Sequence, residues 1–115
     1  MKKQDTCRLL RGIINGIGQA SDLAGNYRYE DFYRDQQAHA TIARYIHTIA
    51  EYERDIPTIV RVKFMLVPWK ELDSMEEAIS RANPADRPRV LWKFSTETLP
   101  RVRLLLEDMV TEMEK

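Results

Sequence analysis

The 115-residue sequence contains few of the features that mark specialised classes of protein. Its single cysteine, Cys7, cannot form a disulfide within the chain, and four glycines and five prolines are too few for a low-complexity linker. No signal-like segment occurs, and no apolar run approaches the roughly eighteen residues that a membrane span needs. We therefore expect a cytoplasmic protein that does not enter the membrane.

An excess of charge of either sign is also absent. Lys and Arg total 18, Asp and Glu total 18, and the formal net charge is zero. Domains that bind nucleic acid through their overall charge are usually basic, so any contact with RNA would need a local basic patch. The length suits one compact domain, and we expect residues 1–115 to form it.

The apolar residues recur at the spacing of helices. The first group is Leu10, Ile13, Ile14 and Ile17, which predicts a helix from about Gln4 to Ala24, with Gly25-Asn26 where a C-terminal cap would sit. A second helix, from about Tyr29 to Arg54, has the clearest pattern. Its predicted inner face consists of Ala38, Thr41, Ile42, Tyr45, Ile46, Ile49 and Tyr52.

The segment from Ile56 to Val67 is harder to assign, because Pro57 lies near its start and it is rich in β-branched residues. We predict a short helix and a connector there. A third helix should run from Pro68 to about Asn83, because proline suits a first helical turn and Leu72, Met75 and Ile79 share one face.

The last predicted helix begins after Asp86, a plausible N-cap residue. Its apolar stripe is Leu91, Phe94, Thr98, Val102, Leu105, Leu106 and Met109. Pro100 lies inside the stripe and should kink the helix rather than end it, since the pattern resumes beyond it. No segment alternates with a period of two, so the sequence predicts an all-α fold, an antiparallel four-helix up-and-down bundle with a short extra helix or connector between helices two and three.

The segment from Ile56 to Leu72, with Pro68-Trp69-Lys70-Glu71-Leu72 at its end, resembles the stretch that leads into the catalytic helix of HepT-like ribonuclease toxins of the HEPN superfamily. Val90-Leu91-Trp92 and Thr98-Leu99-Pro100 are similar to the aliphatic-Trp pair and the later Leu-Pro of that family. Arg44 to Glu51 resembles its second helix. The resemblance covers about Leu9 to Met109; Met65, where the family usually has proline, departs from it.

In the family, Met-Arg-Asn-x-x-x-His-x-Tyr follows the Pro-Trp and contains the ribonuclease motif R-x-x-x-x-H. In the same frame this chain keeps Met75 and changes every chemical residue. The resemblance implies that Glu76 replaces the phosphate-binding arginine, Glu77 the asparagine and Arg81 the histidine. Asn83 replaces the tyrosine that the family's partner nucleotidyltransferase modifies with AMP.

These replacements remove the chemistry of metal-free RNA cleavage. A histidine can take and give a proton near neutral pH, whereas the guanidinium of Arg81 stays protonated, and losing this acid–base catalysis costs on the order of a hundred- to ten-thousand-fold in rate. A carboxylate at position 76 would also repel a phosphate. Glu77 and Arg81 are spaced to form an ordinary surface pair on a helix, which we prefer to a dedicated new site.

Other motifs are weaker. Arg34 and His39 also spell R-x-x-x-x-H, but they precede the core stripe of helix two, and two residues give little specificity. His39 and His47 lack further ligands at matching spacing, so we expect no metal site and no cofactor. Gly12, Gly16 and Gly18 favour a close helix crossing rather than a phosphate loop.

Three functions remain open. The first is a catalytically silent homodimer that binds or assembles with a minimal nucleotidyltransferase, the partner that the family's toxin–antitoxin arrangement implies; the altered groove near helix three would lie at or beside the dimer interface. The second is an active endoribonuclease that uses displaced residues such as Arg34 and His39. The third is a structural dimer without a partner.

Overall fold

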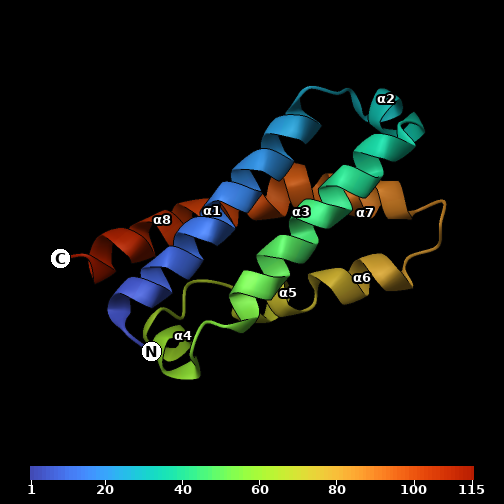
Figure 1. Cartoon of the computed structure of the whole chain (residues 1–115). Coiled ribbons are helices and arrows are strands. Elements are labelled where there is room, and N and C mark those ends of the chain that lie inside the picture. Colours follow the sequence, from blue (N-terminus) through green and yellow to red (C-terminus); the bar gives the residue numbers. More distant parts are fainter.

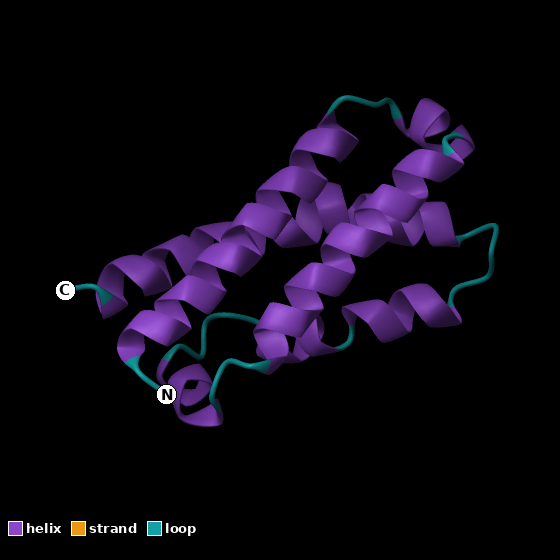
Figure 2. Ribbon diagram, viewed as in Figure 1, coloured by secondary structure: helices purple, strands orange, loops and turns teal.

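The computed structural model describes residues 1–115 and contains helices but no strand (Figures 1 and 2). The helices are α1 (Lys3–Gly25), α2 (Tyr29–Arg34), α3 (Gln36–Arg54), α4 (Thr58–Lys63), α5 (Trp69–Asp73), α6 (Met75–Arg81), α7 (Arg87–Lys93) and α8 (Leu99–Met113), with a π-helical segment, η1 (Phe94–Thr98), between the last two. The predicted all-α fold is confirmed.

The long elements run alternately in opposite directions along a body of 44 × 26 × 20 Å (Figure 1). α1 leads away from the N-terminus, α3 returns, α5 and α6 lead away again, and α7, η1 and α8 return. The short helix α4 lies at the same end of the molecule as the N-terminus. It is the short helix predicted between Ile56 and Val67. The α6–α7 loop and α2 lie at the other end.

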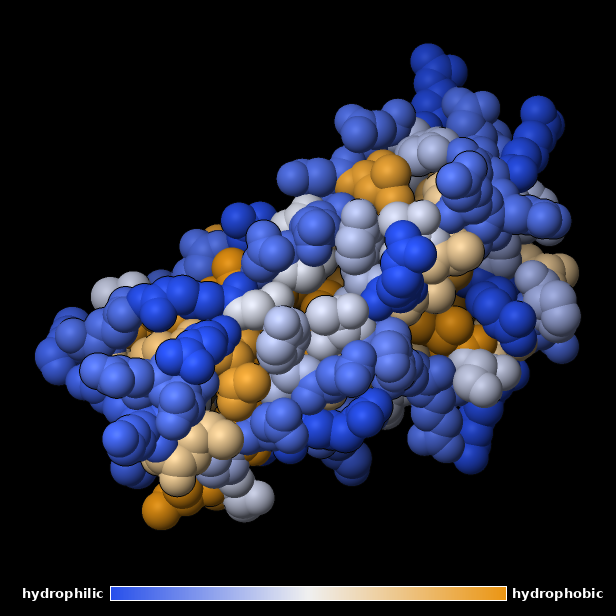
Figure 3. Space-filling view, viewed as in Figure 1, coloured by the Kyte–Doolittle hydropathy of each residue, from blue (hydrophilic) through white to orange (hydrophobic).

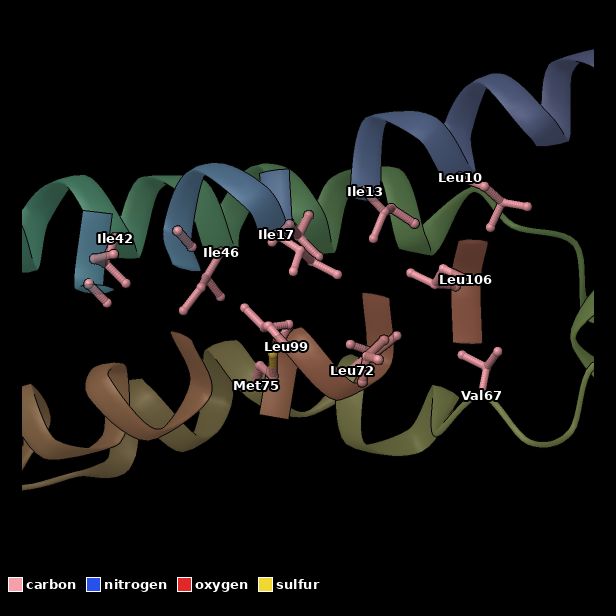
Figure 4. Packing of buried hydrophobic residues seen from close by; sticks show 14 of the residues in the cluster. Leu10, Ile13, Ile17, Ile42, Ile46, Val67, Leu72, Met75, Leu99 and Leu106 are labelled. Atoms are coloured by element: carbon pink, nitrogen blue, oxygen red, sulfur yellow. The ribbon is translucent and has the colours of Figure 1, made fainter. Parts of the chain in front are cut away.

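One cluster of buried apolar side chains joins these elements. In Figure 4, Ile17 of α1 lies near Ile46 of α3, Leu10 of α1 lies beside Leu106 of α8, and Leu72, Met75 and Leu99 face the upper helices from below. All of these side chains are fully or almost fully buried. The helical spacing of apolar residues thus identified most of the core, because each stripe faces the others across the bundle.

The close crossing predicted from the glycines lies between α1 and α3. A Cβ atom on Gly16 would come within 2.9 Å of Cγ1 of Ile49, and one on Gly12 within 2.9 Å of the Tyr52 ring. Neither glycine has a positive φ angle, so both serve to bring the helices together rather than to turn the chain.

The predicted second helix is wrong as a single element, because the chain breaks at Asp35. This residue has an extended conformation (φ −98°, ψ 91°), and its carboxylate accepts a hydrogen bond from the Ala38 backbone N–H at 3.0 Å. It is therefore the N-cap of α3, and a capping residue within a helical pattern was the overlooked signal. α2 turns aside to bury Phe32.

The predicted third helix is also divided, at Ser74, into α5 and α6. Asp86 does precede α7 at the N-cap position, but its side chain makes no capping hydrogen bond there. At the end of α1, Asn26 has a right-handed conformation (φ −84°, ψ −3°), so the expected cap forms without the left-handed residue that Gly25 would favour.

Pro100 disturbs the last helix by widening the turn that precedes it. The Leu99 N–H bonds to the Phe94 carbonyl, five residues back, and Pro100 has no N–H to offer the Ser95 carbonyl. The Ser21 hydroxyl donates to that carbonyl instead, at 2.9 Å. The wide turn shifts the inner face by one residue: Ser95 and Leu99 are fully buried, whereas Phe94 and Thr98 of the predicted stripe are only partly buried.

Candidate functional site

The helix α6 carries the positions of the family motif, and Met75 fixes its orientation. The Met75 side chain is fully buried in the core. The residues that follow Met75 lie on other faces of α6, and their side chains therefore point to α3 or to solvent. Met75 is the one motif residue that the sequence kept, and its role here is packing.

Glu76 points to α3 and is held there by His47 and Arg54. Its Oε2 lies 2.7 Å from Nδ1 of His47, and its Oε1 accepts a hydrogen bond from Nη2 of Arg54 at 3.0 Å. The other ring nitrogen of His47 lies 3.2 Å from Glu51 on its own helix. The hydrogen bond to Glu76 raises the pKa of His47 above its ordinary value, and the negative charges of Glu76 and Glu51 add to this.

Glu77 and Arg81 form the predicted surface pair. Nη2 of Arg81 lies 2.7 Å from Oε1 of Glu77, and both side chains are largely exposed. Asn83 lies beyond the helix end, where its carbonyl accepts hydrogen bonds from the backbone of Asp86 and Arg87. The structure therefore does not bring the four candidate residues together: Glu76 faces α3, whereas Glu77, Arg81 and Asn83 face solvent.

A hollow of about 270 Å³ lies beside Glu76, between α3 and α6. Ala43, Ile79, Ser80 and Arg87 complete its lining, and none of the other three candidate residues contributes to it. No group of three His, Cys, Asp or Glu side chains is placed to share a metal ion. As it stands, the hollow offers one carboxylate, already paired, and one guanidinium.

Sequence reasoning missed Arg87, which closes the far end of α6. Its Nε donates to the Ile79 carbonyl at 3.1 Å and its Nη2 to the Ala82 carbonyl at 3.2 Å. Cations are favoured at the C-terminal ends of helices, where carbonyls are left unpaired. The contact spans eight residues, so no helical spacing in the sequence signals it.

The rival pair Arg34 and His39 lines one hollow, of about 350 Å³, at the tip formed by α2 and the α6–α7 loop. The two residues do not share a helix, because the break at Asp35 separates them. Nε2 of His39 lies 2.6 Å from the Phe32 carbonyl, and since a carbonyl only accepts, this nitrogen carries the proton. Nδ1 is then the nitrogen left for other contacts.

A second polar cluster, missed by sequence reasoning, joins α3, α4 and α5. Arg61 lies 2.7 Å from the buried Oε1 of Glu53, though not aligned for a hydrogen bond, and donates to both oxygens of Asp73 at 3.2 Å. Its guanidinium also lies 5.3 Å from the ring centre of Trp69, whose indole N–H donates to the Arg61 and Phe64 carbonyls. This cluster packs three elements together.

The two carboxyl groups of this cluster titrate in opposite directions. Burial, reinforced by a hydrogen bond with Asp73, raises the pKa of Glu53 to about 8, and the charge of Arg61 only partly offsets this. Burial also opposes ionisation of Asp73, but hydrogen bonds from Glu53 and Arg61 outweigh it and lower the pKa of that group. At neutral pH the cluster therefore holds one proton on Glu53, a negative Asp73 and a positive Arg61.

None of the helices has the length and apolar character needed to cross a bilayer.

The second tryptophan of the chain, Trp92, is partly buried at the tip opposite Trp69. Its ring centre lies 5.2 Å from that of Phe32 and 5.6 Å from that of Tyr29. Both tryptophans thus anchor short elements to the bundle.

Known proteins similar to this chain are named as ribonucleases. The chain is 26% identical to "Probable ribonuclease HepT" of Thermococcus cleftensis over 82% of its own length and 86% of that protein. It is 22% identical to "Putative RNase MJ1216" of Methanocaldococcus jannaschii, over 99% and 94% of the two chains, and 24% identical to "Putative RNase MJ1380" of the same organism, over 93% and 98%.

No family model matches the chain, and no solved structure gives a significant match. The similarity to the named proteins nevertheless extends over most of the chain. The resemblance predicted from the sequence is thereby confirmed: proteins similar to this chain over most of its length are named ribonucleases, one of them HepT.

Proposed function

We propose that this protein is a catalytically silent HepT-like protein that acts as a dimeric binding or assembly partner. The pairing of Glu76 carries the proposal. At the position where the family motif has its phosphate-binding arginine, this chain has a carboxylate held by His47 and Arg54. A phosphate approaching α6 would meet a negative group whose cationic neighbours are already engaged.

The position of the family histidine supports the same reading. Arg81 points to solvent and pairs with Glu77, and its guanidinium cannot act as a base at ordinary pH. His47 is the histidine that contacts α6, and both of its ring nitrogens face carboxylates. A ribose hydroxyl would have to displace one of these carboxylates to reach a ring nitrogen.

An apolar surface at the tip near α4 supports assembly with another chain. Met65 and Leu66 are 79% and 85% exposed, and Ile59 and Val62 on α4 are also exposed. A hollow of about 260 Å³ beside them is lined by Phe64, Val67, Leu105 and Met109. Exposed apolar patches next to a pocket are typical of protein interfaces. In Figure 3, apolar atoms reach the surface at this tip, at the lower left.

We propose a second copy of the chain as the first partner and a minimal nucleotidyltransferase as the second. Asn83 offers no phenolic oxygen for transfer of AMP, so the second pairing would serve assembly rather than modification. Co-expression with a minimal nucleotidyltransferase, followed by co-purification, tests it. A stable complex with no mass increase of AMP on this chain is expected, and adenylylation of the chain would contradict the proposal.

An RNA cleavage assay tests the proposed catalytic silence. Purified protein should leave a labelled single-stranded RNA intact, and so should Arg81→Ala. A variant with Glu76→Arg, Glu77→Asn, Arg81→His and Asn83→Tyr restores the motif, and any cleavage it gains would show that these positions were the missing element. Cleavage by the unaltered protein that Glu76→Gln or Arg81→Ala abolishes would overturn the proposal.

The second candidate is an active endoribonuclease that uses Arg34 and His39, and one observation favours it: both residues line the same hollow. It predicts RNA cleavage by the unaltered protein that His39→Ala abolishes and Arg81→Ala leaves unchanged. The same assay therefore separates the two functions.

A further inference from the structure

Two adjoining hollows at the tip formed by α2, α3 and α7 have a lining without any carboxylate. They measure about 330 and 350 Å³ and share Gln36, His39, Pro84 and Pro88. Arg87 lines the first and Arg34 the second. We call the two together the arginine hollow. In a chain in which 31% of residues are charged and the net charge is zero, an acid-free lining with two arginines is a local positive site.

The two arginines of this hollow lack the partners that most arginines of the chain have. Arg8, Arg11, Arg54, Arg61, Arg81, Arg89, Arg101 and Arg103 each contact a carboxylate. Neither Arg34 nor Arg87 lies within ion-pair distance of one. Their charges are therefore available to an anion from solution.

The hollow also holds its polar groups in place before a ligand arrives. The Nε and Nη2 atoms of Arg87 are fixed by the Ile79 and Ala82 carbonyls, which leaves Nη1. Nε2 of His39 is fixed by the Phe32 carbonyl, which leaves Nδ1. Groups that are already ordered lose little entropy when they bind, so such a site favours a ligand with matching geometry.

The remaining walls are apolar. Pro84 and Pro88 line both parts of the hollow, Leu91 and Ile79 line the inner part, and Tyr33, 45% exposed, lines the outer part. Figure 3 shows apolar atoms between the hydrophilic side chains of α3 and those of α6. A ligand with a phosphate at the arginines and a flat ring against proline and tyrosine would match both the positive and the apolar walls. Each of the two hollows has the size of a small-molecule site.

We propose that the arginine hollow binds a nucleotide phosphate, with Arg34 and Arg87 on the phosphate oxygens and Tyr33 beside the base. The ligand is either a free nucleotide or one residue of a single-stranded RNA. This proposal rests on the hollow and not on the proposed silence of α6, because binding at this tip requires no proton transfer.

The test is a titration of the full chain with a fluorescein-labelled oligoribonucleotide and, separately, with a fluorescent analogue of AMP. Arg34→Gln should weaken binding of the probe by about tenfold, as expected for loss of a charge-assisted contact. For the oligoribonucleotide it should also reduce the slope of log affinity against log salt concentration by about 0.7. Arg44→Gln is the matched control: Arg44 is exposed and has no carboxylate partner, but lies outside the lining.

Binding of both probes would identify a mononucleotide site, and binding of the oligoribonucleotide alone would identify a site for a strand. Either result supports the proposal if Arg34→Gln weakens it and Arg44→Gln does not. Equal losses in both variants, or no binding of either probe below about millimolar concentration, would overturn it. Arg87→Gln is informative only alongside a thermal unfolding curve, because Arg87 also closes α6. If the protein cleaved RNA and His39→Ala abolished the cleavage, the proposed catalytic silence would be wrong, but the proposed binding at the arginine hollow would stand.

Discussion

At the scale of single residues, sequence spacing predicts contacts within one helix, such as Glu77–Arg81, but not the contacts that Glu76 makes with another helix. The pair Glu77–Arg81 could be predicted because its partners are one helical turn apart. The partners of Glu76 lie 29 and 22 residues earlier, on a different helix. The sequence showed that the motif was altered at four positions, but not that one of the replacements would be neutralised by His47 and Arg54.

The first prediction concerns the pH dependence of this contact. The folded protein raises the pKa of His47, so the contact stabilises the fold below the ordinary histidine value of about 6.5 and is lost as the pH rises through the higher folded value. The difference in melting temperature between the unaltered protein and Glu76→Gln should therefore shrink between about pH 6 and pH 8. Loss of the charge attraction to Arg54 contributes a constant part, since arginine does not titrate there.

Glu77→Gln is the control, because its partner Arg81 keeps its charge over this range. Its effect on the melting temperature should be flat with pH. A difference for Glu76→Gln that stays equally flat would show that His47 gains nothing from the contact in solution.

The second prediction concerns Glu53. With a folded pKa of about 8, this residue keeps its proton in the fold over a range in which the unfolded chain has lost it, so stability falls as the pH rises toward 8. Glu53→Gln imitates the protonated form and should gain stability relative to the unaltered protein between pH 5.5 and pH 8.5. Urea unfolding at the two pH values measures the change.

Glu107→Gln serves as the comparison, because Glu107 pairs with Arg103 on the surface of one helix. If Glu53→Gln and Glu107→Gln shift by the same amount between the two pH values, Glu53 is ionised in the fold. The raised pKa would then be wrong, and the cluster with Arg61 and Asp73 would carry a second negative charge.

At the scale of elements, the sequence predicted where helices lie better than where they break. The stripes of α1, α3 and α8 could be read because buried side chains repeat with the turn of the helix. The break at Asp35 depends on one hydrogen bond to Ala38, and the wide turn of η1 depends on Pro100 together with a hydroxyl from α1. Such features need a partner from elsewhere in the fold, and periodicity contains no information about that partner.

The third prediction tests the contact between α1 and η1. Ser21→Ala removes the donor to the Ser95 carbonyl, which neither Leu99 nor Pro100 can replace, and should lower the free energy of unfolding by about 1 kcal/mol. Ser95→Ala is the natural comparison: the Ser95 hydroxyl is buried and has no hydrogen-bond partner, so its removal should be neutral or slightly stabilising. Chemical denaturation of both variants measures the two changes, and equal losses would argue against the proposed role of Ser21.

At the scale of the whole molecule, the antiparallel order puts the two proposed surfaces at opposite tips. The apolar surface with Met65 and Leu66 lies at the α4 tip, and the arginine hollow lies where α2 meets the α6–α7 loop (Figure 1). The composition could not locate either surface, because the net charge of the whole chain is zero and its apolar content is ordinary. A dimer joined through the first surface would leave the second one open on each copy.

The fourth prediction follows from this separation. The unaltered protein should sediment as a dimer at micromolar concentration, and Leu66→Glu should convert it to a monomer, because a buried unpaired carboxylate is strongly unfavourable in an interface. Tyr33→Glu places the same charge on an exposed side chain at the opposite tip and should leave the dimer intact. A monomeric unaltered protein, or a dimer that survives Leu66→Glu, would refute the α4 surface as the interface.

The wide turn at η1 makes one place in the bundle tolerant of a change in chain length. Elsewhere in a helix, removal of a residue rotates every later side chain by about 100° and would carry the core stripe of α8 out to solvent. Between Leu91 and Leu99 the chain has one residue more than a regular α-helix would use, since the Leu99 N–H bonds five residues back. A deletion there would convert the segment to ordinary helix while Val102, Leu106 and Met109 stayed in place, so related chains that are one residue shorter could share this same core.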